Sequence, residues 1–474
     1  MTALAAAPTV LAAGAGAGLD PGLDPGDTAW LLAATALVLL MAPGLALFYG
    51  GMVRSKSVLN MMMMTFGALA VITVVWVLVG YSLAFGDDLG AGLLGDPRQY
   101  AGLGQLMSAA SNGSAHVPLI LFAAFQGLFC VITGALVSGA IADRARFGAW
   151  LVFVALWTVV VYAPVAHWVF DVGRAGRAGH AGGWLVNRLG LVDFAGGTAV
   201  EICSGASGLA LAMVLGHRIG FGKDPMRPHN LTLVMLGAGL LWFGWFGFNA
   251  GSALGADQAA AVVFTTTLVA GAAGSLGWLA LERYRDGHAT SLGAASGLVA
   301  GLVAITPSCG SLSPLGAIVM GGAAGAVCAW AVGLKYRFGY DDSLDVVGVH
   351  LVGGVVGTVG IGLLATAAAP TGVDGLLYGG GVAQLGRQLT GGGVVLVYAL
   401  VVSGVLGLVV DRVLGFRIDE EHEVTGIDLV VHAETAYDLH ATAGARTAGH
   451  GILGAITQPA AQPSSPRREG EPRP

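Results

Sequence analysis

The sequence predicts an all-α membrane protein with eleven transmembrane helices, and three observations lead to this fold class. Of the 474 residues, 55% are hydrophobic and only 11% are charged, whereas an ordinary soluble domain carries roughly 25% charged residues. The 78 glycines follow no G-x-y period, which excludes collagen and is typical of membrane helices packed closely through small residues. Apolar runs of about 20 residues, the length needed to cross the hydrocarbon layer, recur along the chain.

Eleven such runs can be delimited in order. The stretch from Gly287 to Leu334 contains no Asp, Glu, Lys or Arg, and the turn-like segment Thr306 to Pro314 divides it in two. The segment from Gln99 to Ala142 likewise combines an Asn-Gly loop with a span. The predicted spans are 28–50, 59–85, 117–141, 149–170, 194–216, 230–250, 258–281, 289–306, 314–334, 346–366 and 391–411.

Basic residues set the orientation of these spans, because cytoplasmic loops are enriched in Lys and Arg. They cluster after the odd-numbered spans and predict an outside N-terminus and an inside C-terminus in a multi-pass protein of the cytoplasmic membrane. The residues concerned are Arg54, Lys56, Arg144, Arg146, Arg218, Lys223, Arg227, Arg283, Arg285, Lys335, Arg337, Arg412 and Arg417.

The chain divides into four regions. Residues 1–26 are expected to be a short extracytoplasmic segment, because the first 19 residues lack the basic start of a signal peptide. The eleven-helix domain spans 27–414, and a charged cytoplasmic region spans 415–440. Residues 441–474 are rich in Ala, Gly, Pro, Ser and Arg, which predicts a disordered tail.

Composition also excludes several functions. A net charge of −6 gives no reason to expect nucleic acid binding. The four cysteines show neither disulfide-framework nor zinc spacing, so we expect small buried residues. Neither a His-Glu-x-x-His pattern nor a nucleophile–base constellation occurs, which argues against an enzyme and predicts no metal or cofactor.

Two ionisable residues lie within predicted spans, where a charge costs about 2.5–3.5 kcal/mol on insertion scales. Glu201 lies in the fifth span, which runs inward, and His350 in the tenth, which runs outward. This placement is what two inverted five-helix repeats plus one extra helix would produce. The pair is either a proton- or cation-handling site or a structural pair, and intramembrane ionisable residues favour the first interpretation.

Aromatic residues cluster on two spans and have two interpretations. Phe122, Phe125 and Phe129 recur at helical spacing on the third span, while Trp245 and Phe248 belong to a cluster on the sixth. Such stripes are usually packing, but ring faces also attract ammonium-like cations.

Taken together, five segments resemble the ammonium transporter family, in its Amt/Mep branch, from about Asp27 to Tyr437. Their order and the predicted topology make the resemblance specific. The segments are Phe48-Tyr-Gly-Gly-Met-Val-Arg-Ser-Lys56, Phe125-Gln-Gly-Leu-Phe129, Asp193-Phe-Ala-Gly-Gly-Thr198, Gly244-Trp-Phe-Gly-Phe-Asn-Ala-Gly-Ser252 and Asp345-Val-Val-Gly-Val-His350.

The resemblance implies a homotrimer with one narrow pore in each subunit, through which ammonium or ammonia enters the cell. It assigns Phe129 and Phe248 to a phenyl gate and His350 to a pair of pore histidines. An outer recruitment site would be formed by Ser252, Asp193, Phe170 and Trp245.

Two positions depart from the usual family pattern. Glu201 stands where the first pore histidine is usual, and Phe170 stands where a vestibule tryptophan is usual, although Trp168 is nearby. Phe170 would weaken a cation–π site, since Trp is the best such partner. We expect Glu201 and His350 together to relay the proton removed from ammonium.

The region after the last span resembles the family's cytoplasmic regulatory motif, with Gly426, Asp428, His432, Glu434 and Tyr437. It implies a possible cytoplasmic partner, a PII-type regulatory trimer; an ordinary charged segment is the alternative. Two other functions stay open, an ammonium sensor and an Rh-like channel for neutral ammonia.

Overall fold

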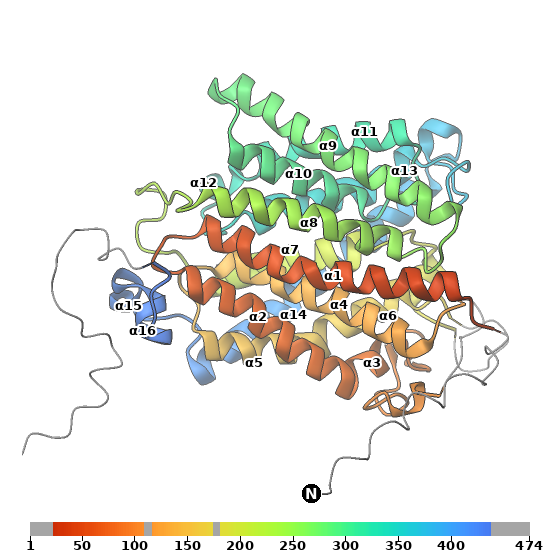
Figure 1. Cartoon of the computed structure of the whole chain (residues 1–474), viewed down its shortest axis with the longest axis horizontal. Coiled ribbons are helices and arrows are strands. Elements are labelled where there is room, and N and C mark those ends of the chain that lie inside the picture. Colours follow the sequence, from red (N-terminus) through yellow and green to blue (C-terminus); the bar gives the residue numbers. More distant parts are fainter. Residues whose placement is uncertain (1–21, 109–115, 174–180, 438–474) are drawn as a thin grey trace, which may run out of the picture. The chain divides into compact units, whose positions relative to one another are not determined.

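The computed structural model describes residues 22–108, 116–173 and 181–437, and one compact helical unit contains the described residues up to Ala436 (Figure 1). Most of the predicted extracytoplasmic segment 1–26 and the whole predicted tail 441–474 lie outside the described residues.

The α-helices account for most of this unit. They are α1 (Pro25–Met52), α2 (Val58–Val75), α3 (Tyr81–Phe85), α4 (Leu119–Ser138), α5 (Phe147–Trp157), α6 (Ala163–Phe170), α7 (Cys203–Leu215), α8 (Leu231–Gly251), α9 (Gln258–Asp286), α10 (Ser291–Ile305), α11 (Pro314–Ala331), α12 (Leu334–Phe338), α13 (Val352–Leu364), α14 (Ala383–Leu414), α15 (Glu420–Thr425) and α16 (Ile427–His432).

Shorter elements join or interrupt these helices. The π-helical turns are η1 (Trp76–Gly80), η4 (Thr158–Tyr162), η5 (Leu185–Leu189), η6 (Gly197–Ile202) and η7 (Val347–Leu351), and the 3₁₀ turns are η2 (Gly104–Leu106), η3 (Gly139–Ile141) and η8 (Leu376–Tyr378). Strands β1 (Asp88–Leu89) and β2 (Leu94–Gly95) form a small antiparallel pair in which Asp88 faces Gly95.

A helix coincides with each predicted span, but the lengths differ. Within the described ranges, ten helical segments are long and apolar enough to cross a membrane. The predicted span 289–306 corresponds to α10, which has 15 residues and is about 22 Å long at ~1.5 Å per residue, shorter than the ~30 Å hydrocarbon layer. The fold is therefore an all-helical membrane architecture of about ten long helices.

Glycine allows the helices to approach closely. On α8, a Cβ at Gly237 would meet the backbone nitrogen of Phe48 in α1, and one at Gly247 would lie 2.5 Å from Leu37 Cβ. On α11, a Cβ at Gly325 would meet the backbone oxygen of Gly274 in α9. These contacts explain the high glycine content, since backbones can touch only where side chains are absent.

Candidate functional site

The helix that carries Glu201 begins at Asp193. The Asp193 carboxylate accepts hydrogen bonds from the backbone nitrogens of Gly196, Gly197 and Thr198 at 2.7–2.8 Å, and also from the Thr198 hydroxyl. Gly196 has φ +110°, which favours glycine. Asp193 thus satisfies the free N–H groups that begin η6. It supports Glu201, eight residues later, through the backbone.

The helix that carries His350 is built in the same way. Asp342, also eight residues earlier, accepts hydrogen bonds from the backbone nitrogens of Val346 (3.1 Å) and Val347 (2.7 Å) at the start of η7. Asp345, the acidic residue of the family motif, instead pairs with Lys335 at 2.7 Å. Sequence reasoning missed the capping role of Asp342, which depends on the path of the loop.

Glu201 and His350 meet where η6 and η7 pack together. The Oε2 atom of Glu201 lies 2.7 Å from Nδ1 of His350, and the residues are only 1% and 4% exposed. A contact this short between a carboxyl and an imidazole requires a proton between the two atoms. The structure therefore brings together the two ionisable residues that the sequence placed within spans.

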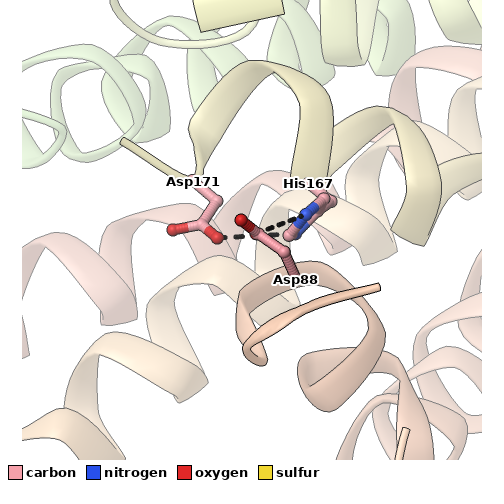
Figure 2. A group of neighbouring side chains, drawn as sticks. All are labelled: Asp88, His167 and Asp171. Atoms are coloured by element: carbon pink, nitrogen blue, oxygen red, sulfur yellow. Dashed lines mark ion pairs between the residues drawn. The ribbon is translucent and has the colours of Figure 1, made fainter. Parts of the chain in front are cut away.

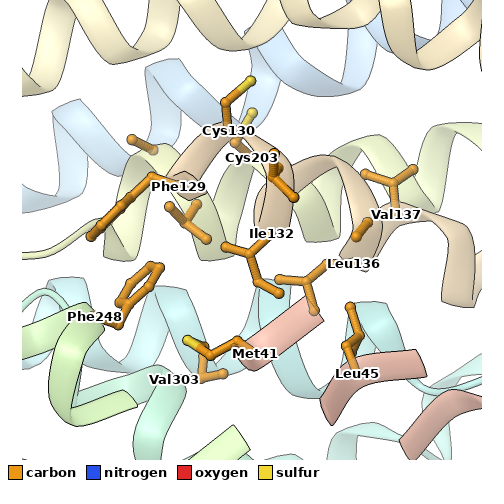
Figure 3. Packing of buried hydrophobic residues seen from close by; sticks show 14 of the residues in the cluster. Met41, Leu45, Phe129, Cys130, Ile132, Leu136, Val137, Cys203, Phe248 and Val303 are labelled. Carbon is orange, nitrogen blue, oxygen red and sulfur yellow. The ribbon is translucent and has the colours of Figure 1, made fainter. Parts of the chain in front are cut away.

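Figure 3 shows the phenyl rings of Phe129 and Phe248, and Phe248 lines the same cavity as Glu201 and His350. The ring centroids of Phe129 in α4 and Phe248 in α8 are 4.0 Å apart, with an interplanar angle of 18°. Phe170, at the end of α6, packs edge-on against Phe129 at 6.3 Å. Trp168 instead contacts Tyr398 at 4.6 Å, so Phe170 is the ring beside the stacked pair.

A narrow apolar cavity connects Phe248 with Glu201 and His350. Its volume is about 10 Å³, close to that needed to hold one water. It is lined by Met41, Leu45, Phe48, Ile132, Leu136, Val200, Glu201, Leu241, Trp245, Phe248, Val299 and His350. A second cavity of about 10 Å³ shares Phe48, Val299 and His350 with the first and reaches Leu344 and Asp345. His350 therefore lines both cavities, and Glu201 lines the first.

The other residues assigned to the outer site lie in two places. Trp245 lines the first cavity, and its Nε1 donates a hydrogen bond to the hydroxyl of Thr306 (2.9 Å). Ser252 caps the end of α8, is partly exposed, and donates a hydrogen bond to the backbone oxygen of Phe248 (2.8 Å). Ser252 is thus one helical turn beyond the stacked rings.

The segment after α14 folds back onto the beginning of α2. The Asp428 carboxylate accepts hydrogen bonds from the backbone nitrogens of Leu59 (2.9 Å) and Asn60 (2.8 Å). His432 lies 3.1 Å from the side-chain oxygen of Asn60. Burial raises the pKa of Asp428 above its ordinary value, although these backbone hydrogen bonds oppose the shift. Asp428 therefore supplies the cap that Ser57 does not provide.

The remaining residues of the predicted regulatory motif differ in their surroundings. Gly426 has φ +118°, and a Cβ there would lie 2.9 Å from Cβ of Lys56. Glu434 and Tyr437 are exposed. Close packing against Lys56 explains glycine at 426, while the two exposed side chains are available to solvent.

A buried charge network that sequence reasoning missed lies beside this segment. Glu423, whose side chain is 0% exposed, pairs with Arg54 (3.4 Å) and Arg417 (3.1 Å). Arg218 pairs with Asp341 at 2.7 Å. Burial alone would raise the pKa of Asp341, but the Arg218 hydrogen bonds hold it below its ordinary value. Separate loops are thereby joined at one end of the helices.

Comparisons with known proteins decide the family. The model of the Ammonium Transporter Family matches residues 29–437. The chain belongs to the ammonium transporter family. An ammonium transporter of Mycobacterium tuberculosis is 56% identical over 439 residues, which cover 88% of this chain and 91% of that protein.

Solved structures of the family have the same fold. The crystal structure of Saccharomyces cerevisiae Mep2 has a TM-score of 0.76 and 36% identity, covering 85% of this chain and 89% of that one. A solved structure named "Sensor Amt Protein" has a TM-score of 0.78 and 27% identity, covering 85% and 98%. This ammonium transporter is thus a multi-pass membrane protein whose substrate is ammonium, and it is a transporter rather than an enzyme.

Proposed function

We propose that this transporter moves ammonium into the cell by separating it into ammonia and a proton at the Glu201–His350 pair. The observation that carries the proposal is the 2.7 Å contact between Glu201 and His350 at an apolar, water-sized cavity that is also lined by Phe248, one of the two stacked phenyl rings. Ammonia and ammonium are both about the size of water, so the cavity suits them.

The outer part of the path would select the cation. Ammonium would meet Ser252 and Phe170, with Asp193 supporting the neighbouring helix start and Trp245 lining the path further in. The faces of Phe170 and Phe129 attract a cation. With centroids only 4.0 Å apart, the stacked Phe129 and Phe248 rings must swing aside for each passage.

Physical chemistry then favours separating the proton from ammonia. An ammonium ion loses its hydration when it enters an apolar cavity, and this costs much more free energy than the dehydration of neutral ammonia. The carboxylate of Glu201 takes the proton that ammonium releases, and His350 passes a proton onward to the second cavity. Ammonia crosses the apolar space as a neutral molecule and regains a proton on the far side.

The proposal extends to topology and assembly. The transporter would cross the cytoplasmic membrane eleven times, with α10 as the short crossing, as two inverted repeats plus α14. It would assemble as a homotrimer with one pore in each subunit. The docked segment around Asp428 would be the site at which a PII-type regulatory protein acts.

Current recordings on full-length protein in liposomes test the relay. We expect an ammonium jump to give a saturable current in the wild type and in Glu201→His, which restores a proton-carrying side chain. Glu201→Gln keeps the shape and a hydrogen bond to His350 but carries no proton at that position, so we expect a loss of roughly a hundredfold, the scale of general acid–base effects.

The same recordings separate the alternatives. An unchanged current and pH profile in a folded Glu201→Gln protein would refute the relay. Alkalinisation of the lumen without current in the wild type would indicate a channel for neutral ammonia. Ammonium binding without flux would indicate a sensor, the function for which the structural relative "Sensor Amt Protein" is named.

A further inference from the structure

His167 is a fully buried histidine in the last turn of α6, three residues before Phe170. Figure 2 shows its ring paired with the carboxylates of Asp88, which begins β1, and Asp171, which directly follows α6. Asp88 lies far from His167 in the sequence, so the ring links the end of α6 to a strand from another part of the chain.

The two nitrogens of the His167 ring contact two different elements. Nδ1 lies 2.9 Å from the backbone oxygen of Ala84 in α3, and because a carbonyl oxygen only accepts, Nδ1 donates. Oδ2 of Asp171 lies 3.5 Å from the same nitrogen. Nε2 lies 3.3 Å from Oδ1 of Asp88, and neither of these two atoms has another hydrogen-bond partner among the described residues. A proton shared between Nε2 and Oδ1 makes this contact favourable in a buried place.

Asp88 extends the contact to the segment that precedes η5. Its other oxygen accepts hydrogen bonds from the backbone nitrogens of Ala181 (2.6 Å) and Gly182 (3.0 Å). The next residue, Gly183, packs against the end of α6 so closely that a Cβ there would meet the backbone oxygen of His167. Asp88 and His167 therefore hold the end of α6 against both β1 and this segment.

Phe170 is the last residue of α6, so the position of its ring depends on how firmly the end of this helix is held. The backbone hydrogen bond that closes the last turn, from Asp171 to the oxygen of His167, is 3.4 Å long, longer than the usual ~2.9–3.0 Å. The Phe170 ring packs edge-on against Phe129 with 6.3 Å between centroids. On another side, a Cβ at Gly196 would lie 3.3 Å from it. A shift of the end of α6 would either separate Phe170 from Phe129 or press it against Gly196.

We propose that His167 is a positioning residue for ammonium recruitment, and that its contacts with Ala84 and Asp88 hold Phe170 at the edge of Phe129. The inference rests on the recruitment role proposed above for Phe170. His167 is 0% exposed and lines neither of the two cavities, so it acts through Phe170 rather than on ammonium itself. It therefore affects how tightly ammonium is captured, and not the transfer of the proton.

Ammonium currents of full-length protein in liposomes, measured over a range of ammonium concentrations, test this role. His167→Ala removes both ring contacts, and we expect the KM for ammonium to rise roughly tenfold, the scale of a lost cation–π contact, with a much smaller change in maximal current. His167→Asn keeps a donor near the position of Nδ1 but does not reach Asp88, so its KM should be intermediate. Ser403→Ala removes buried hydrogen bonds to Trp157 and Ser207 in another part of the fold. It is the matched control and should keep the wild-type KM.

Two substitutions at Asp88 separate position from charge. The amide oxygen of Asp88→Asn can keep both backbone hydrogen bonds while its NH₂ donates to Nε2 of a neutral His167, so the KM should stay near that of the wild type. Asp88→Ala loses these contacts and should raise the KM as much as His167→Ala does. Equal increases in KM for Asp88→Asn and Asp88→Ala would overturn the inference, because the negative charge of Asp88 would then attract ammonium directly.

Phe170→Leu shows whether His167 acts through Phe170. We expect Phe170→Leu to raise the KM and His167→Ala to add little in that background, because effects that pass through one side chain are not additive. Additive increases, or an unchanged KM in folded His167→Ala and Asp88→Ala proteins, would overturn the inference and leave recruitment at Phe170 standing. An unchanged KM in Phe170→Leu alone would refute the recruitment role and the inference with it. The proton relay is tested separately, by the current of Glu201→Gln.

Discussion

Asp193 and Asp342 have equivalent roles, each accepting backbone hydrogen bonds eight residues before a member of the Glu201–His350 pair. A short carboxylate at a helix start fixes the backbone that follows. The two caps therefore set the 2.7 Å contact from both sides without touching the path between Glu201 and His350. The arrangement fits the predicted repeats, because the same local construction occurs in both halves.

Asp342, which lies outside the membrane-spanning segments, gives a pH-dependent prediction. Burial raises its pKa from 3.8 to about 6, opposed by Lys335 and reinforced by Asp345. The folded state then holds a proton that the unfolded state releases, so this contribution to stability is present below pH ~4 and is lost as pH rises to about 6. At ~1.4 kcal/mol per pKa unit, the loss is at most about 3 kcal/mol.

Thermal unfolding in detergent at several pH values measures this contribution. Asp342→Asn should remove the pH-dependent component between pH 4 and 6, while the exposed Asp224→Asn should keep the wild-type profile. Identical profiles for wild type and Asp342→Asn would show that Asp342 does not titrate in this range.

Among the helices, the close contact between α13 and η6 depends on the glycine at position 354. A Cβ at Gly354 in α13 would lie 2.8 Å from Cβ of Glu201, closer than real Cβ contacts allow. We expect Gly354→Ala to displace Glu201 from His350, to reduce ammonium current, and to destabilise the protein by about 1–3 kcal/mol. A Cβ at Gly393 in α14 meets nothing within 4 Å. Gly393→Ala should therefore leave the ammonium current unchanged and raise the free energy of unfolding by about 0.5–1 kcal/mol.

The docked segment gives a second prediction at this scale. Asp428→Ala removes the acceptor for two backbone N–H groups at the start of α2, which should cost about 0.5–2 kcal/mol and free the segment from Asn60. A glutamyl endopeptidase should then cleave the segment from Glu420 to Glu434 faster than it cleaves the wild type. Asp419→Asn, at an exposed pair with Arg146, is the control and should be cut at the wild-type rate.

The helices could be predicted from sequence more completely than their interruptions. Apolar length alone located α1 to within three residues at each end, because unpaired backbone groups are so costly in lipid that an apolar run must be helical. The π-helical turns η6 and η7 could not be predicted, since they depend on capping and packing by distant segments. Sequence placed Glu201 and His350 within spans, but only the fold gives their contact.

At the scale of the whole molecule, the buried ion pairs join loops that the sequence predicts to lie on one side of the membrane. Arg54, Arg218 and Arg417 come from three loops that each follow an odd-numbered predicted span, and they meet around Asp143 and Glu423. Loops that meet in one ion-pair network lie at one end of the helices, so they must share one side of the membrane. Their positive charge predicts that this side is the cytoplasm.

Labelling of introduced cysteines tests this orientation. All four native cysteines are buried, so the wild type should give little background. Met107→Cys lies in an 80% exposed position after η2, and Asp224→Cys lies in the exposed loop after Arg218. A membrane-impermeant maleimide added to intact cells should label only Met107→Cys, and both variants should react after the membrane is opened. Labelling of Asp224→Cys alone in intact cells would show that the predicted orientation is wrong, and that the outer recruitment site proposed above faces the cytoplasm.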